Sequence, residues 1–190
     1  MLRILMSALF SMALLAGYAH GQGMTVSDVD IPGSIEVEGQ ELDLIGAGQR
    51  SRWFMNLYVG SLYLPEPMDA DTIVAADEPM AITLHITSGM INSDRMTSAT
   101  EEGFEAATGG NTAPIRDYID EFMGVFEEEI EEGDVFHIAY LPEQGVVVYR
   151  NGEQTGSVDG GMAFKQALFG IWLGDDPAQD SLKKAMLAEG

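Results

Sequence analysis

The sequence predicts an α+β domain, in which helices pack against one face of an antiparallel sheet. Three observations indicate this class. Segments of alternating apolar and polar residues come first, two helical patterns follow, and hairpin-like strands return before a helical C-terminal part. Strands and helices do not alternate one by one, as they would in a parallel sheet. No repeat or proline-rich linker divides the chain, so we expect one domain.

The first 21 residues have the pattern of a secretory signal peptide. Arg3 gives a positive start, residues 4–17 are apolar, and the small residues Ala19 and Gly21 stand at the two positions read for cleavage. The apolar run is too short for a membrane span, which needs about 20 residues. We therefore expect cleavage after Gly21, a periplasmic or secreted protein, and no integral membrane span afterwards.

The expected strands share period-two alternation and are bounded by turn residues. Residues 22–33 are polar and are expected to form a flexible lead-in to a domain over residues 34–190. Two short strands within 34–44 surround the turn at Gly39 and Gln40. The other expected strands are 53–64, 81–87, 134–141, 145–150 and 153–158.

The expected helices share apolar residues at three- and four-residue steps. Ser93 can cap the first helix, Pro114 suits the first turn of the second, and Gly133 suits its end. Asp180 is a candidate cap for the last helix. The expected helices are 94–107, 113–132, 162–173 and 181–188.

Acidic residues dominate the composition. The chain has 31 Asp and Glu against 9 Lys and Arg, a formal net charge of −22. Such a surface repels phosphate backbones, so we expect no nucleic-acid partner, and the charge itself is typical of high solubility or a saline habitat. The chain has no cysteine, which excludes thiol catalysis and cysteine-bound zinc.

Metal-binding and nucleophile motifs are not found in the sequence. His85 and His137 stand alone in predicted strands, and the acidic segments "EEEIEE" and "DDPAQD" lack calcium-loop spacing. No serine lies in a G-x-S-x-G turn, and "GAG" lacks the remaining residues of a phosphate loop. We therefore expect no metal and no other cofactor.

Arg50 is the most informative charged residue. It follows Gly46 and Gly48 and precedes an aromatic, apolar segment. A desolvated guanidinium needs a carboxylate or an equivalent partner. That partner is either an anionic ligand or an internal Asp or Glu, and a surface position is the third possibility. We expect the two glycines to bend the backbone and aim Arg50 inward, whereas Arg52 reaches outward to an exposed pair with one of the many acidic residues.

Several segments resemble the chalcone isomerase-like superfamily, most closely its exported bacterial members. These are "LIGAGQR", the aromatic segment ending "VGSLYLPEP", "ITLHIT", "EEGFEA", "YRNGEQTGSV" and "FKQALFGIWLGDDPAQDSLKKAML", in the family's order. The resemblance covers nearly all of the chain after residue 21. It implies an open-faced β-sandwich, in which a large antiparallel sheet carries a layer of helices with a cleft between them.

The resemblance also implies which residues would carry isomerase chemistry. The family's catalytic arginine corresponds to Arg50, which is retained. A strand threonine corresponds to Tyr58, a helix tyrosine to the neighbourhood of Arg95, a helix asparagine to that of Glu102, and a late hydroxyl to Ile171. Four of the five positions differ, so the resemblance implies that the hydroxyl network needed to polarise a substrate is missing.

Other members of the superfamily are non-catalytic fatty-acid-binding proteins. In these, the arginine holds a carboxylate and a tyrosine replaces the threonine, as Arg50 and Tyr58 would here. The resemblance thus implies an exported protein that binds a small amphipathic carboxylate and has no catalytic residues. Two alternatives stay open: a lyase or isomerase of aromatic enones, and an interaction module with a vestigial cleft. The candidate wall residues, which also fit ordinary core packing, are Phe54, Phe104, Phe122, Leu168, Ile171 and Trp172.

Overall fold

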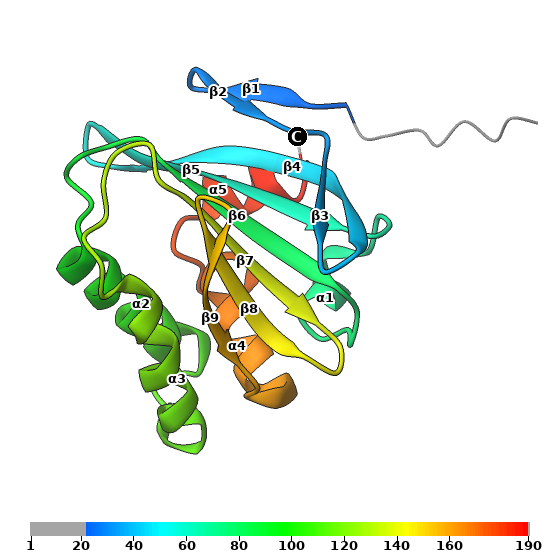
Figure 1. The fold of residues 1–190 in the computed structure, drawn as a ribbon, viewed down its shortest axis with the longest axis vertical. Helices are drawn as coiled ribbons and strands as arrows, with labels where there is room; N and C mark the ends of the chain where they lie inside the picture. The colour runs from blue at the N-terminus through cyan, green and yellow to red at the C-terminus, as the bar shows by residue number, and fades with distance from the viewer. Residues whose placement is uncertain (1–21, 190) are drawn as a thin grey trace, which may run out of the picture.

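The computed structural model describes residues 22–189, and its centre is a seven-stranded sheet (Figure 1). Every pair of neighbouring strands is antiparallel and consecutive along the chain. This confirms the predicted α+β class. The signal peptide predicted over residues 1–21 lies outside the described residues. The strands are β3 (Ser34–Val37), β4 (Gln40–Arg52), β5 (Met55–Leu64), β6 (Met80–Ile86), β7 (Val135–Leu141), β8 (Gly145–Arg150) and β9 (Glu153–Val158).

The hairpin of β4 and β5 differs from the prediction. The sequence predicts a short strand before residue 44 and a single strand from Trp53 to Leu64, whereas β4 continues for 13 residues to Arg52. The chain then turns at Trp53, whose φ of 59° reverses its direction. Arg50 therefore lies inside β4, directly opposite Tyr58 on β5.

The predicted flexible lead-in over residues 22–33 instead contains a small hairpin. Its strands β1 (Met24–Val26) and β2 (Val29–Ile31) pair antiparallel, and Ser27 and Asp28 turn between them with positive φ. The apolar residues Val26, Val29 and Ile31 pack against the apolar cluster on one face of the large sheet. This burial explains why the segment is structured although its composition is polar.

Helices lie on the other face of the sheet (Figure 1). The longest of them, α2, is capped by Asn92, whose Oδ1 accepts a bond from the Arg95 amide at 3.0 Å, and not by Ser93 as predicted. Asp180 is the first residue of α5, and not its cap. The helices are α1 (Ala70–Ile73), α2 (Ser93–Ala107), α3 (Arg116–Met123), α4 (Gly161–Leu173) and α5 (Asp180–Met186).

The predicted helix over residues 113–132 is shorter in the structure. Only α3 and two flanking 3-10 turns, Ala113–Ile115 and Gly124–Phe126, are helical. The chain leaves the helix because Arg150 binds the carbonyl of Glu129, and the Asp134 carboxylate accepts a bond from the Glu131 amide at 2.8 Å. These bonds replace the intrahelical partners of the segment.

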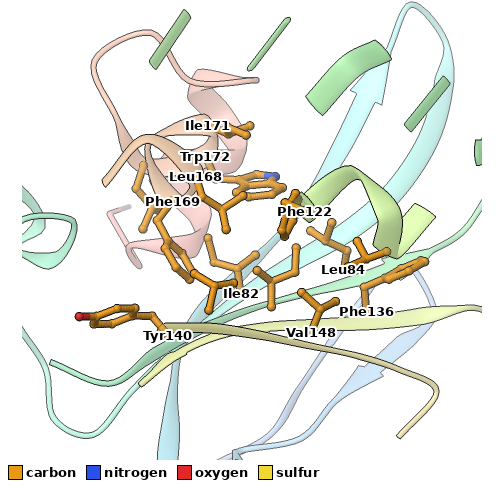
Figure 2. Packing of buried hydrophobic residues seen from close by; sticks show 14 of the residues in the cluster. Ile82, Leu84, Phe122, Phe136, Tyr140, Val148, Leu168, Phe169, Ile171 and Trp172 are labelled. Carbon is orange, nitrogen blue, oxygen red and sulfur yellow. The ribbon is translucent and has the colours of Figure 1, made fainter. Parts of the chain in front are cut away.

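The main core lies between the helices and the sheet. Figure 2 shows Leu168, Phe169 and Trp172 of α4 directed toward Ile82 of β6, with Phe122 of α3 beside them. Apolar side chains on both faces of the sheet are buried, because β1, β2 and β3 contribute residues to the second cluster. Both faces therefore bury apolar side chains, although neither is covered by a second large sheet and most of β9 stays exposed.

Lys165 is a fully buried cation in α4. Its Nζ donates to the carbonyls of Ile73, Val74 and Ala76 at 2.8–2.9 Å, and the Tyr140 ring lies 5.3 Å away. Burial lowers the pKa of this amine to about 8, so it stays mostly charged at neutral pH. The lysine joins α4 to the end of α1 by satisfying carbonyls that the short helix leaves free.

Replacing Lys165 with methionine should destabilise the protein. The variant keeps the apolar stem but leaves one buried and two part-buried carbonyls without this donor, and a buried group left unpaired costs about 1–3 kcal/mol. We expect the free energy of unfolding to fall by at least about 2 kcal/mol in urea titrations. The exposed Lys184→Met variant is the control, and an equal loss in both would contradict the proposed role.

Candidate functional site

A cavity of about 450 Å³ lies between the end of the β4–β5 hairpin and α2. One wall comes from the sheet and holds Arg50, Leu57 and Tyr58. The other wall comes from α2 and the loop before it, and includes Ile91 and Met96. The cavity thus places one half-buried cation, Arg50, and one phenol beside apolar residues.

Arg50 is half-buried and is held by a backbone carbonyl. Its Nη1 donates to the carbonyl oxygen of Ala178, in the loop between α4 and α5. Among residues 22–189, no Asp or Glu side chain forms an ion pair with it, although the chain has 31 acidic residues. The internal ion pair that was one explanation of Arg50 is therefore not found in the described part of the chain. The guanidinium has further N–H donors for another acceptor.

The loop between α4 and α5 fixes the end of β4. The Ala178 amide donates to the Ile171 carbonyl at 2.7 Å, which sets the carbonyl that Arg50 binds. Gln179 Oε1 accepts a bond from the Ser51 amide at 3.0 Å, so the loop also binds the residue after Arg50. The sequence identified this acidic segment only as a rejected calcium loop and as part of the family resemblance, and its positioning role was missed.

Tyr58 lies beside Arg50 with its ring buried and its hydroxyl fixed. The Trp172 Nε1 donates to the Tyr58 hydroxyl oxygen at 2.9 Å. Burial raises the pKa of the Tyr58 phenol, and the Arg50 charge and the Trp172 bond oppose that rise only in part. The phenol therefore keeps its proton at neutral pH. Because its oxygen accepts from Trp172, its own O–H can donate to a group in the cavity.

Gly46 and Gly48 act differently from the prediction. They do not form a bend before Arg50, because both lie in the extended strand β4. A Cβ at Gly46 would come within 2.8 Å of the Met186 carbonyl oxygen, and one at Gly48 within 2.6 Å of the Ala185 Cβ. The glycines therefore allow α5 to approach β4 closely. They share the helix-facing side of β4 with Arg50, since alternate residues of a strand face the same way.

The predicted wall residues lie in different parts of the structure and do not form one wall. Phe54 lies at the hairpin turn with its side chain fully exposed, and does not line the cavity. Phe104 is buried against Phe164 in an aromatic cluster. Ile171 packs against Gly103, and Trp172 touches the site only through Tyr58. The predicted residues that line the cavity are Arg50 and Tyr58.

Several lining residues were missed by the sequence reasoning. Leu57, Ile91 and Met96 form apolar surface, and Met55 and Met90 lie at the rim. The signal that could have found them is the gathering of methionines in the segments before and within α2, since methionine adapts to varied ligands.

Charged residues of both signs surround the mouth of the cavity. Arg52 and Arg95 line it, as do Asp94 and Glu102, and all four are exposed. Arg95 also donates to the Met90 carbonyl at 2.6 Å, which links α2 to the preceding loop. Water and salt weaken the attraction between an exposed charge and an anion. Arg50, which is half-buried behind these residues, is therefore the strongest anchor for an anion.

The two histidines in the described part of the chain, His85 and His137, do not line this cavity. His137 Nδ1 lies 2.8 Å from the Thr83 hydroxyl, across neighbouring strands. Burial lowers the pKa of both His85 and His137, so both are neutral at pH 7. Within residues 22–189, no group of three or more His, Asp or Glu side chains could hold a metal ion.

The comparisons with known proteins identify the family and the fold. A family model described as chalcone isomerase-like matches residues 23–188. The chain belongs to the chalcone isomerase-like family. A search of curated proteins found no match. The fold of this family member is similar to the crystal structure of a fatty-acid binding protein from Arabidopsis thaliana, with a TM-score of 0.68 and 16% identity over 84% of this chain and 92% of that one.

This chalcone isomerase-like chain brings together most of the positions that the resemblance implied. Arg50, Tyr58, Arg95 and Glu102 all border the cavity, whereas Ile171 does not. In the described part of the chain, no helix is both long and apolar enough to cross a membrane.

Replacing Gly46 with alanine should disturb the site through α5. The added methyl group would meet backbone carbonyls of α5, which cannot rotate away, and overpacking of this kind costs about 1–3 kcal/mol. We expect a corresponding loss in urea unfolding. Gly124→Ala is the matched control, because its Cβ meets nothing within 4 Å and its φ is helical, so it should leave stability unchanged or raised. Equal stability of the two variants would contradict the close-packing role.

Proposed function

We propose that this protein is a non-catalytic binder of a small amphipathic carboxylate, such as a fatty acid. One observation carries the proposal: Arg50 faces an apolar cavity, and its charge has no carboxylate partner among residues 22–189. A half-buried cation in that position is stabilised by an anion from outside the chain.

The headgroup would lie between Arg50 and Tyr58. These residues are direct cross-strand partners, so their side chains leave the sheet on the same face. Arg50 supplies the charge and the free N–H donors, and Tyr58 supplies a neutral O–H held in place by Trp172. A carboxylate accepts both kinds of donor at once, whereas an uncharged headgroup leaves the Arg50 charge uncompensated.

The tail would lie along the apolar part of the cavity. Leu57, Ile91 and Met96 supply this surface, and the volume of about 450 Å³ lies within the range of about 300–1,000 Å³ for small-molecule sites. The similar Arabidopsis protein is named as a fatty-acid binder, which supports the same ligand class here. The proposed setting is periplasmic or secreted, on the strength of the pattern in residues 1–21.

The enzyme alternative has less support from the same residues. Attack on an enone needs donors aimed at the developing oxyanion. At the positions implied by the resemblance, Arg95 and Glu102 are exposed charges and Ile171 is apolar, so only Arg50 remains from the family's set. The interaction-module alternative would give Arg50 only its structural bond to the Ala178 carbonyl and would leave its charge without an anion.

Arg50→Ala should weaken the binding of a medium-chain fatty acid by about 1.5–3 kcal/mol, the range for a hydrogen bond to a charged group. Arg50→Lys should recover only part of the loss, because a point charge replaces a planar fork. Isothermal titration calorimetry measures both, and mass spectrometry of the denatured wild-type protein checks for a co-purified acyl acid.

Arg52→Ala is the matched control, since this neighbour is exposed and should contribute about 0–1 kcal/mol. Equal losses at both arginines, or no loss at Arg50, would contradict the proposed anchor. Turnover of a chalcone by the wild-type protein would favour the enzyme alternative. If the protein neither binds a fatty acid nor turns over a chalcone, the interaction module is favoured.

A further inference from the structure

The turn between β4 and β5 carries an unusual group of exposed apolar side chains. Trp53 is 84% exposed and Phe54 is fully exposed. Met55 and Met90 beside the same cavity are also exposed. Of the six large apolar side chains exposed among residues 22–189, these four belong to one region, which we call the apolar tip. Figure 1 shows that this hairpin end projects beside the loop leading to α2.

The apolar tip is not what a turn in water requires. Trp53 has a φ of 59°, a conformation in which glycine or asparagine is favoured and a bulky residue is uncommon. Phe54 follows it with no contact that shields its ring from water. Local turn chemistry would place small polar residues at both positions. The two aromatic rings therefore fit a partner outside the described chain.

We propose that the apolar tip inserts into the surface of a phospholipid bilayer. Each aromatic side chain can bury about 150–250 Å², so the two rings offer roughly 300–500 Å². A stable protein dimer buries about 800 Å² on each partner, and a narrow hairpin end does not supply that area. A bilayer needs no matching surface, and tryptophan favours its interfacial region.

The charges next to the apolar tip fit the same partner. Two exposed cations, Arg52 and Arg95, border the cavity beside the tip. Exposed Arg52 directly precedes Trp53, at the height where lipid phosphates lie when the rings are inserted. The net charge of −22 opposes binding to strongly anionic membranes, so a zwitterionic lipid is the fitting surface.

Insertion of the apolar tip would bring the cavity mouth to the lipid. Trp53, Met55 and Met90 belong both to the tip and to the cavity lining. An amphipathic ligand could then pass between bilayer and cavity without crossing water. This access route rests on the proposed function, whereas the docking itself rests only on the tip.

The test uses vesicles of phosphatidylcholine with brominated acyl chains, which quench nearby tryptophan. The chain has two tryptophans, and Trp172 is only 5% exposed, so quenching reports Trp53. We expect quenching in the wild-type protein. Phe54→Ser should weaken partitioning about tenfold or more, from the loss of one buried aromatic ring. Met24→Ser, which removes another exposed apolar side chain, should bind vesicles as the wild type does.

Three outcomes would overturn the proposal: no quenching of Trp53, equal partitioning of Phe54→Ser and wild type, or an equal loss in Met24→Ser. A concentration-dependent dimer that Phe54→Ser abolishes in sedimentation would also overturn it, by assigning the tip to self-association.

Two variants distinguish docking from ligand binding. Phe54→Ser should keep its fatty-acid affinity in calorimetry, because Phe54 does not line the cavity. Arg50→Ala should keep its vesicle binding. Vesicle binding without fatty-acid binding would remove the proposed function and leave docking intact, and the reverse result would remove docking alone.

Discussion

The close contact between α5 and β4 determines where the charge of the cavity lies. Gly46 and Gly48 allow the helix to approach the strand, and the loop before the helix then reaches the strand end. That loop supplies the Ala178 carbonyl that holds Arg50. A wider separation would leave the guanidinium free to turn toward solvent and its many acidic neighbours. The geometry of the binding site therefore depends on two glycines, Gly46 and Gly48, which have no side chain to keep α5 away from β4.

The held arginine also explains how a strongly acidic protein can keep a site for anions. Electrostatic repulsion from exposed carboxylates is screened within about 10 Å at moderate ionic strength, while a half-buried charge is screened much less. Tyr58 adds a donor without adding charge, and its burial keeps the phenol protonated. The exterior and the cavity can thus have opposite electrostatic character.

The sequence predicts the sheet and most helices because periodicity reports burial directly. It also singles out Arg50, since a charge beside apolar residues stands out in a strand pattern, whereas Tyr58 is reached only through the family resemblance. The sequence does not reveal that Trp172 supports Tyr58, because these residues are 114 positions apart. Nor does it show that residues after Phe126 leave the helix, since their bonds go to Arg150 and Asp134. Contacts between distant segments decide such details, and local patterns do not encode them.

The sheet is a meander, in which each strand pairs with its neighbours along the chain. Apart from the pairing of β6 with β7, which residues 87–134 separate, these contacts close short loops and form early, because the entropic cost of closure grows with loop length. The bond from Arg50 to Ala178 spans 128 positions, and the contact of Tyr58 with Trp172 spans 114. We therefore expect the sheet to assemble before the cavity. Because the α4–α5 loop holds the end of β4 through such distant contacts, we expect local unfolding of this loop to release the Arg50 guanidinium while the sheet stays folded.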